Sequence, residues 1–124
     1  MLREDQLRPA VLIVEHATPI RMNMVDLVDQ AGCRAIEAIS ADDALLLLRQ
    51  LGDIKVIVVD LDTPGSIDGL QLLGTARALC PTIGVIAVSG YGRPAASELP
   101  TQAIFFPKPF DGSQVMKALR QMSV

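Results

Sequence analysis

Aromatic residues, cysteines and excess positive charge are scarce in this 124-residue chain. It has no tryptophan, one tyrosine and three phenylalanines, so platforms that stack nucleic-acid bases are hard to build. A net charge of −3 also argues against broad binding to a phosphate backbone, which needs a basic face. The two cysteines, Cys33 and Cys80, are separated by more than any metal-binding motif allows. We therefore expect no nucleic-acid partner, and two reduced thiols in the cytoplasm.

Long apolar runs are also missing. None is long enough to cross a bilayer, and the segment Met1–Pro9 lacks the apolar core of a signal peptide. The length is that of one domain, and a hydrophobic fraction of 50% is sufficient for a core. The sequence predicts a cytoplasmic protein without a membrane partner, in which residues 1–9 are a flexible lead-in and residues 10–124 form one domain.

Short apolar segments recur along the chain and predict five strands. Three of them are continuous runs rich in β-branched residues, and two are weaker. Continuous apolarity indicates burial on both faces, as in a parallel sheet. The predicted strands are Ala10–Val14, Arg34–Ala38, Lys55–Val59, Ile83–Val88 and Ala103–Phe106.

Helical patterns separate most of these strands. Residues that commonly cap helices precede each pattern: Thr18, Ser40, Asp68 and Asp111. Strands that alternate with helices predict an α/β fold, an open parallel sheet with helices on both faces. A Gly-x-Gly-x-x-Gly motif after the first strand and a Gly-Lys-Ser/Thr loop are both absent, which disfavours a nucleotide-binding or flavin-binding enzyme.

The segment between the fourth and fifth strands is poor in helical signals. It contains Pro94 and Pro100, and proline is disfavoured inside helices. Residues 93–100 have room for at most two turns. A fourth helix is therefore expected to be shortened or missing.

Polar side chains directly follow four of the strands, where ligands bind in sheets of this type. An acidic, hydroxylic and basic set at one edge suits phosphoryl transfer to a carboxylate, because a carboxylate is a nucleophile towards phosphorus. Magnesium ions prefer one or two carboxylates plus phosphate oxygens, and ammonium and hydroxyl groups stabilise the phosphoryl oxygens. Asp60, after the central run, is the best nucleophile. The set is Glu15, His16, Asp60, Asp62, Ser89 and Lys108.

Four motifs resemble those of response-regulator receiver domains of two-component signalling. They are Val11–Glu15, Val56–Gly69, Val88–Gly92 and Phe105–Phe110, and the resemblance covers residues 10–122. It implies a flavodoxin-like, doubly wound, five-stranded parallel sheet of order 2-1-3-4-5, and a receiver domain over residues 10–124. It also implies a cis Lys108–Pro109 bond. The shortened fourth helix alters a face that often forms dimer or output contacts, so no oligomeric state is assumed.

The resemblance also implies a role for each site residue. Asp60 is the phosphoacceptor, with Lys108 and Ser89 as the other catalytic groups. Ser89 and Phe105 form the switch. An Mg²⁺ cofactor would be held by Glu15, Asp60 and the backbone carbonyl of Asp62, with His16 as a further candidate ligand.

The function that the resemblance implies is that of a single-domain response regulator in a phosphorelay. A histidine kinase or phosphotransfer protein donates the phosphoryl group, and changed protein–protein contacts with a downstream target transmit the signal, since no output domain follows Val124. Such a chain is not an enzyme beyond self-catalysed phosphorylation and dephosphorylation. The alternative is a phosphorylation-independent protein-binding module, which His16 and the shortened helix favour and the retained Asp60, Ser89 and Lys108 disfavour.

Two residues depart from the receiver pattern. His16 replaces the second acid of the metal-binding pair, and imidazole suits Mn²⁺ or Zn²⁺ better than Mg²⁺. Three interpretations of His16 are open. Its side chain points to solvent while Glu15 binds the metal, it weakens Mg²⁺ binding, or it forms a transition-metal site. Asp62, two residues after Asp60, also has three interpretations. Its side chain adds acidity near the cation, it orients a water molecule, or it is an exposed loop carboxylate. The loop over residues 65–69 also contains one extra residue.

Overall fold

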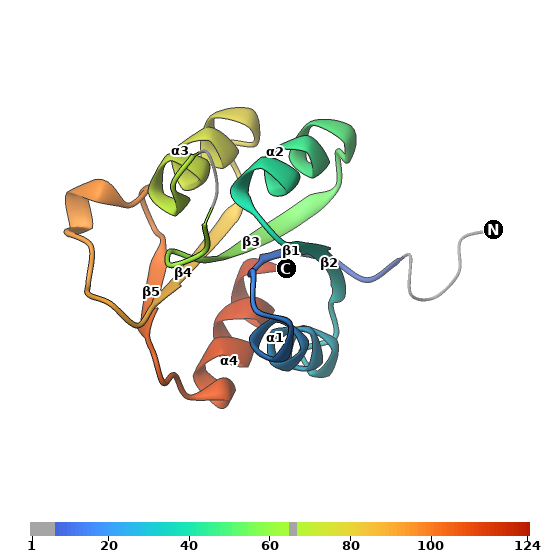
Figure 1. Cartoon of the computed structure of the whole chain (residues 1–124). Coiled ribbons are helices and arrows are strands. Elements are labelled where there is room, and N and C mark those ends of the chain that lie inside the picture. The colour runs from blue at the N-terminus through green and yellow to red at the C-terminus, as the bar shows by residue number, and fades with distance from the viewer. Residues whose placement is uncertain (1–6, 65–66) are drawn as a thin grey trace.

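A parallel β-sheet forms the centre of the structure. The computed structural model describes residues 7–64 and 67–124, and within them five strands lie in the order β2-β1-β3-β4-β5 (Figure 1). This order confirms the flavodoxin-like, doubly wound α/β fold predicted from the sequence. Residues 1–6 of the predicted lead-in and the Gly65–Ser66 part of the longer loop lie outside the described residues. The strands are β1 (Ala10–Val14), β2 (Arg34–Ala38), β3 (Ile54–Asp60), β4 (Gly84–Ser89) and β5 (Ile104–Pro107).

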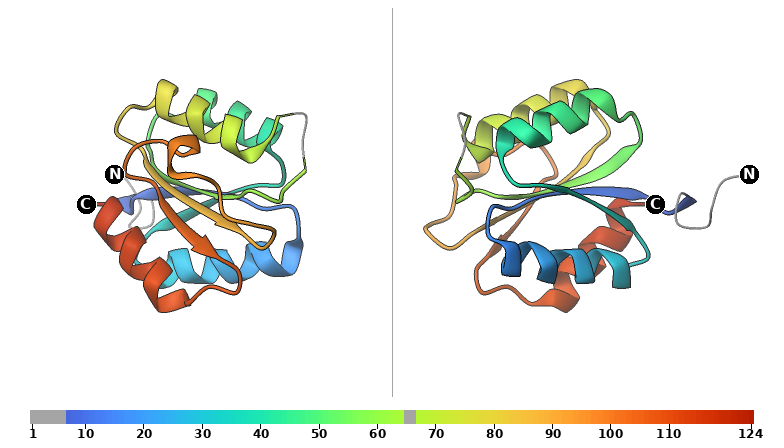
Figure 2. Two further views of the ribbon diagram at one scale, coloured as in Figure 1. Left: turned by 90° about the vertical axis from the view of Figure 1, so that its left-hand side faces the viewer. Right: turned by 45° about the vertical axis from the view of Figure 1, so that its right-hand side comes forward.

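Helices cover both faces of the sheet, as Figure 2 shows. Helices α1 (Thr18–Gln30) and α4 (Gly112–Met122) lie on one face. Helices α2 (Ala41–Gln50) and α3 (Gly69–Leu79) lie on the other. No helix in the described part of the chain is both long and apolar enough to cross a membrane.

The central strands are buried on both sides because successive side chains point to opposite faces. Leu12 and Ile57 pack in the layer of α2 and α3, whereas Val11 and Val56 pack in the layer of α1 and α4. All four are fully buried, and each contributes about 1.5–3 kcal/mol by leaving water. This double-sided burial explains the continuous apolar runs, and it fixes the strand ends on a rigid base.

Capping side chains begin three of the four helices as predicted. Ser40 accepts a hydrogen bond from the Asp43 N–H, and Asp68 forms a reciprocal capping box with Gln71. Asp111 accepts from the Ser113 N–H. The prediction of Thr18 as a cap was wrong.

Thr18 is the first helical residue of α1 and not its N-cap. The N-cap is Ala17, whose carbonyl accepts the Arg21 N–H at 2.9 Å and closes the first turn. Pro19 accounts for this start, because its fixed φ suits the first turn and its missing N–H leaves no unpaired donor. The helix therefore begins without a side-chain cap.

The connection between β4 and β5 confirms the prediction that the helix expected there is shortened. Its helical part is a single 3₁₀ turn, η2 (Ala96–Glu98), within residues that are all described. The Glu98 carboxylate accepts the Ala95 N–H at 2.8 Å and closes the turn. Arg77 of α3 donates to the Thr101 carbonyl at 2.8 Å, which ties the connection to its neighbouring helix. The Lys108–Pro109 bond is cis, also as expected.

Candidate functional site

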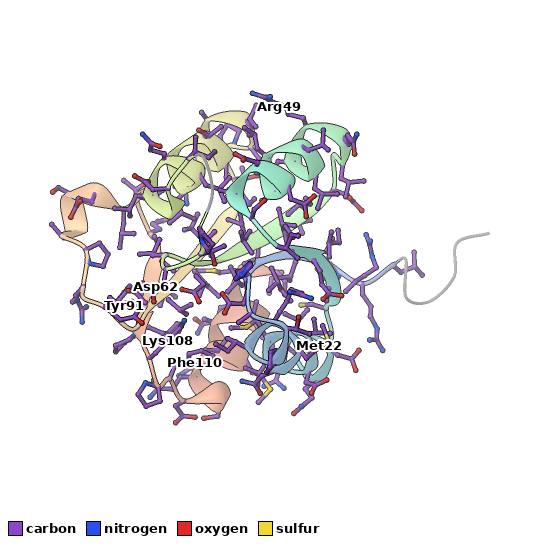
Figure 3. All side chains as sticks on the ribbon, in the orientation of Figure 1. Met22, Arg49, Asp62, Tyr91, Lys108 and Phe110 are labelled. Carbon is purple, nitrogen blue, oxygen red and sulfur yellow. The ribbon has the colours of Figure 1, made fainter. Side chains whose placement is uncertain are left out.

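Strand register brings the polar strand ends together at one edge of the sheet. Val14 pairs with Val59, so Glu15 and Asp60 leave β1 and β3 at the same level. Asp60 pairs with Val88, which places Ser89 one residue further along β4. Ser89 pairs with Pro107, which places Lys108 one residue further again. Side chains from three adjacent strands and from the residue that follows β5 thus converge, and Figure 3 shows Asp62 and Lys108 at this edge.

Asp60 lies at the centre of the site. Its side chain is 4% exposed, and one carboxylate oxygen, Oδ2, accepts a hydrogen bond from Lys108 Nζ. The other, Oδ1, accepts the backbone N–H of Asp62 at 2.9 Å. Glu15 is 5% exposed and accepts the Thr63 hydroxyl at 3.2 Å. Two buried carboxylates therefore share the neighbourhood of one ammonium group.

The charges of these groups are strongly perturbed. Burial, and then a hydrogen bond shared with the Asp60 carboxylate, raise the pKa of Glu15 to about 7. Burial acts to raise the pKa of Asp60 as well, but hydrogen bonds with Glu15 and Lys108 hold that pKa below its ordinary value. Burial opposes the charge of Lys108, but its hydrogen bond to Asp60 raises its pKa. Asp60 is thus a carboxylate near neutral pH, while Glu15 is half protonated.

Folding stability is expected to fall as pH rises from about 5 to about 8 in the absence of divalent cations. The unfolded chain releases the Glu15 proton near its ordinary pKa of 4.5, whereas the folded protein keeps it until about pH 7. The folded state therefore binds more protons in this window. The contribution of Glu15 to folding stability is complete below the unfolded pKa of 4.5 and lost above the folded pKa of about 7. The loss amounts to about 3 kcal/mol at most. Asp60 titrates below this window because its pKa is lowered.

Urea unfolding at a series of pH values, in the presence of a chelator, measures the slope of the unfolding free energy against pH. In Glu15→Gln the slope should become nearly flat, and the variant should be more stable than the wild type at the alkaline end. A Glu15→Gln slope equal to that of the wild type would assign the pH dependence to another group.

The Asp62 side chain does not face the acidic pair. Its Oδ1 accepts the Ser89 hydroxyl at 2.9 Å, and its Oδ2 accepts the Gly90 N–H at 2.9 Å. Lys108 Nζ lies 3.7 Å from the same Oδ2. The interpretation of Asp62 as an exposed loop carboxylate was therefore wrong. The Gly90 N–H was missed, although its place directly after Ser89 at a strand end was a signal for it.

Phe105 lies on β5 and is half-buried against the layer of α2 and α3. The guanidinium of Arg93 stands over its ring, 5.3 Å from the centroid. A cation over an aromatic face is held by about 0.5–1 kcal/mol at an exposed site. The assignment of Phe105 to a switch stays a prediction. No pattern in the sequence pointed to the Arg93 contact.

His16 directly follows Glu15, and its side chain is exposed. Arg21 of α1 donates to the carbonyl oxygens of Glu15 and His16 at 3.2 and 3.4 Å, and it pairs with Glu37 of β2. The exposed ring fits the interpretation in which His16 points to solvent.

The donor set at the acidic pair suits a hard cation. Two buried carboxylates, Glu15 and Asp60, exceed the charge of one Lys108, and burial followed by the interaction with Asp60 raises the pKa of Glu15. No third histidine, cysteine, aspartate or glutamate within residues 7–64 and 67–124 joins them in a metal-binding cluster. One or two carboxylates, a backbone carbonyl and water suffice for Mg²⁺, whereas a transition-metal site uses more side chains.

His16→Asp is expected to tighten Mg²⁺ binding about tenfold, because it adds a hard anionic oxygen next to Glu15. Calorimetric titration with MgCl₂ measures the change. His16→Asn is the matched control, since it removes the imidazole without adding charge, and its affinity should stay near that of the wild type. If His16→Asp titrates like His16→Asn, position 16 does not face the cation.

The fold and the site together define a signal-receiving domain of two-component systems. The chain belongs to the response regulator receiver domain family, whose pattern it matches over residues 11–120. This match covers nearly the whole sequence, and the resemblance found in its motifs is confirmed.

Similar proteins support this assignment. The chain is 36% identical over 116 residues to the sensor kinase CckA of Brucella abortus (strain 2308), which covers 90% of this chain and 12% of that protein. It spans only that small part of the kinase. It is also similar to the receiver domain of the hybrid histidine kinase CckA, with 29% identity, a TM-score of 0.77, and coverage of 93% of this chain and 99% of the other. A receiver protein from Sinorhizobium medicae WSM419 shares the fold, with 22% identity, a TM-score of 0.85, and coverage of 94% and 95%.

Proposed function

We propose that this receiver domain accepts a phosphoryl group on Asp60 from a histidine kinase or phosphotransfer protein. The change in protein–protein contacts that follows would transmit the signal to a downstream protein. One observation supports the proposal most: the Asp60 carboxylate is buried at the end of the central strand and hydrogen-bonded to Lys108. It rests on this chain's own geometry as well as on its family.

The lowered pKa of Asp60 suits a nucleophile. A carboxylate oxygen of Asp60 forms the new O–P bond, while the P–N bond to the donor imidazole breaks and that imidazole keeps the electron pair. Lys108 neutralises charge on the phosphoryl oxygens, and the Ser89 hydroxyl is within the same group of donors. Movement of Ser89 and Phe105 would then alter the surface around β4 and β5.

Magnesium is the cofactor that this donor set fits best, with Mn²⁺ as a substitute. Glu15, Asp60 and the carbonyl of Asp62 would hold it. When bound, it supplies neutralisation of charge between the carboxylate and the incoming phosphoryl oxygens. Burial and the neighbouring Asp60 carboxylate raise the pKa of Glu15 to about 7, so its deprotonation would accompany cation binding.

In this proposal, the protein turns over no external substrate. Its chemistry is limited to self-catalysed phosphorylation and dephosphorylation of Asp60, in the cytoplasm.

Intact-protein mass spectrometry after incubation with acetyl phosphate and Mg²⁺ tests the proposal. One phosphoryl adduct is expected on the wild-type chain, and a chelator should prevent it. A parallel incubation with Mn²⁺ covers the case in which His16 alters the choice of metal. The absence of an adduct with either metal would reject the proposal.

A phosphorylation-independent binding module is the second candidate. The observation that favours it is the Asp62 carboxylate, which accepts the Ser89 hydroxyl and the Gly90 N–H from within the protein itself. Such a chain would present one fixed surface to its partner. It predicts no adduct with Mg²⁺ or Mn²⁺ and an intact fold.

A further inference from the structure

Three hydrogen-bond donors surround the Asp62 carboxylate. They are the Ser89 hydroxyl, the Gly90 N–H and the Lys108 ammonium, and we call them the donor cluster. The first two donate at 2.9 Å, and Lys108 Nζ lies 3.7 Å from Oδ2. They come from the end of β4, the residue after it, and the residue after β5. Residues far apart in the sequence thus converge on one anionic group.

Asp60 shares one member of the donor cluster, Lys108, with Asp62. Lys108 Nζ donates to Asp60 Oδ2, and it is near Asp62 Oδ2 as well. The two carboxylates are two residues apart at the end of β3, where the Asp62 N–H donates to Asp60 Oδ1. A phosphoryl group on Asp60 would place its oxygens beside these donors. Each donor N–H or O–H can be shared only at a cost, because hydrogen bonds to charged groups are directional and strong.

We propose that the Asp62 carboxylate is a tethered anion that occupies the donor cluster and must leave it before an anion on Asp60 can bind there. This inference rests on the proposed function, because it assigns Asp62 a positioning role at the same site. Asp62 thereby sets how readily the phosphoryl group is accepted and how firmly Ser89 holds it.

Two properties of Asp62 suit it to leave. Its side chain is 18% exposed, whereas that of Asp60 is 4% exposed, so a path to solvent exists. It also belongs to the connection after β3 and not to the strand itself, so rotation of its side chain leaves the sheet undisturbed. Repulsion from a phosphoryl group of nearly two negative charges would favour that rotation.

The Asp62 carboxylate also orients Ser89 without phosphorylation. The Ser89 hydroxyl donates to Asp62 Oδ1, and Ser89 Oγ accepts the Tyr91 N–H at 3.2 Å. These two hydrogen bonds hold the Ser89 hydroxyl toward Asp62. The change on phosphorylation would be an exchange of acceptors, from the carboxylate of Asp62 to the phosphoryl oxygens.

Beryllium trifluoride binding tests the inference, since this anion forms a tetrahedral adduct on a carboxylate and resembles a phosphoryl group. The proteins to compare are the wild type, Asp62→Ala and Asp62→Asn, each with Mg²⁺. We expect the dissociation constant to fall about tenfold in Asp62→Ala, because no internal anion has to be displaced. Asp62→Asn should fall in between, since its amide oxygen can still accept from Ser89. Asp26→Ala, at an exposed position of α1, removes the same charge away from the site and should bind like the wild type.

A second measurement needs no added anion. In the ¹H–¹⁵N spectrum of the metal-free proteins, the Gly90 resonance should lie downfield in the wild type and in Asp26→Ala, and should move upfield in both Asp62 variants. Equal or weaker beryllium trifluoride binding by both Asp62 variants, or an unchanged Gly90 resonance, would overturn the inference.

The outcomes separate the inference from the proposed function. An adduct from acetyl phosphate on the wild type, together with unchanged anion affinity in the Asp62 variants, would uphold the function and overturn the inference. No adduct on the wild type, together with tight anion binding by Asp62→Ala, would reject the function and uphold the inference. Failure of every protein to bind the anion would overturn the inference, and the acetyl phosphate adduct alone would then decide the proposed function.

Discussion

Asp60→Asn is expected to show no phosphoryl adduct after incubation with acetyl phosphate and Mg²⁺. An amide oxygen is a far weaker nucleophile than a carboxylate, and the variant also loses one ligand for the cation. The site contains a second carboxylate, Glu15, but Lys108 donates to Asp60, whereas Glu15 accepts from Thr63. Glu15 is therefore expected to be a poor substitute. Intact-protein mass spectrometry should therefore show the unmodified mass alone.

Two controls accompany this measurement. The variant must be folded, and the position of the adduct on the wild type must be known. Asparagine keeps the size of the side chain and can still accept from the Lys108 ammonium, so circular dichroism should show the wild-type fold. Peptide mapping of the wild type should place the phosphoryl group on the peptide that contains Asp60. Stable incorporation into Asp60→Asn would mean that a different residue is the acceptor.

Lys108→Met should destabilise the fold by about 3 kcal/mol and slow phosphorylation at least about a hundredfold. The ammonium is the cation hydrogen-bonded to Asp60, whose side chain is 4% exposed. Its removal leaves the Asp60 carboxylate and Glu15 buried without a compensating charge. The methionine replaces most of the lysine chain in volume, so the loss is one of charge and not of packing.

A double-mutant cycle separates the two contributions. Asp60→Asn introduced into Lys108→Met removes the uncompensated charge and should recover most of the lost stability in urea unfolding. Lys117→Met is the matched control, because Lys117 is exposed on α4, and it should change stability by less than about 0.5 kcal/mol. If the double variant is less stable than Lys108→Met, the Asp60–Lys108 pair is not the source of the effect.

The sequence predicted the fold because its strands are buried on both faces. Continuous apolar runs located β1, β3 and β4 to within a residue or two. Proline placement predicted the shortened helix between β4 and β5. The cap of α1 was wrong because the choice between Ala17 and Thr18 depends on one carbonyl hydrogen bond, which composition does not reveal.

The position of the site was predictable for the same reason, but its loop contacts were not. Parallel strands end at one edge, so residues that directly follow them must meet there. The direction of the Asp62 side chain depends on the turn after β3, and the Arg93 contact with Phe105 depends on the long connection after β4. Side chains that belong to loops take their direction from backbone torsions, and hydrophobic patterns contain no information about these torsions.

Strand register has a consequence for insertions and deletions. Along β3, β4 and β5, Asp60, Ser89 and Lys108 each stand at a fixed offset from the paired residues of the next strand. Because side chains alternate between the faces, gaining or losing one residue inside such a strand would turn every later side chain to the opposite face. Residues 92–102 lie between strand ends and are free of this constraint. Changes of length in homologous chains should therefore collect in that connection. A chain with only one 3₁₀ turn between β4 and β5 can still keep the arrangement of Asp60, Ser89 and Lys108.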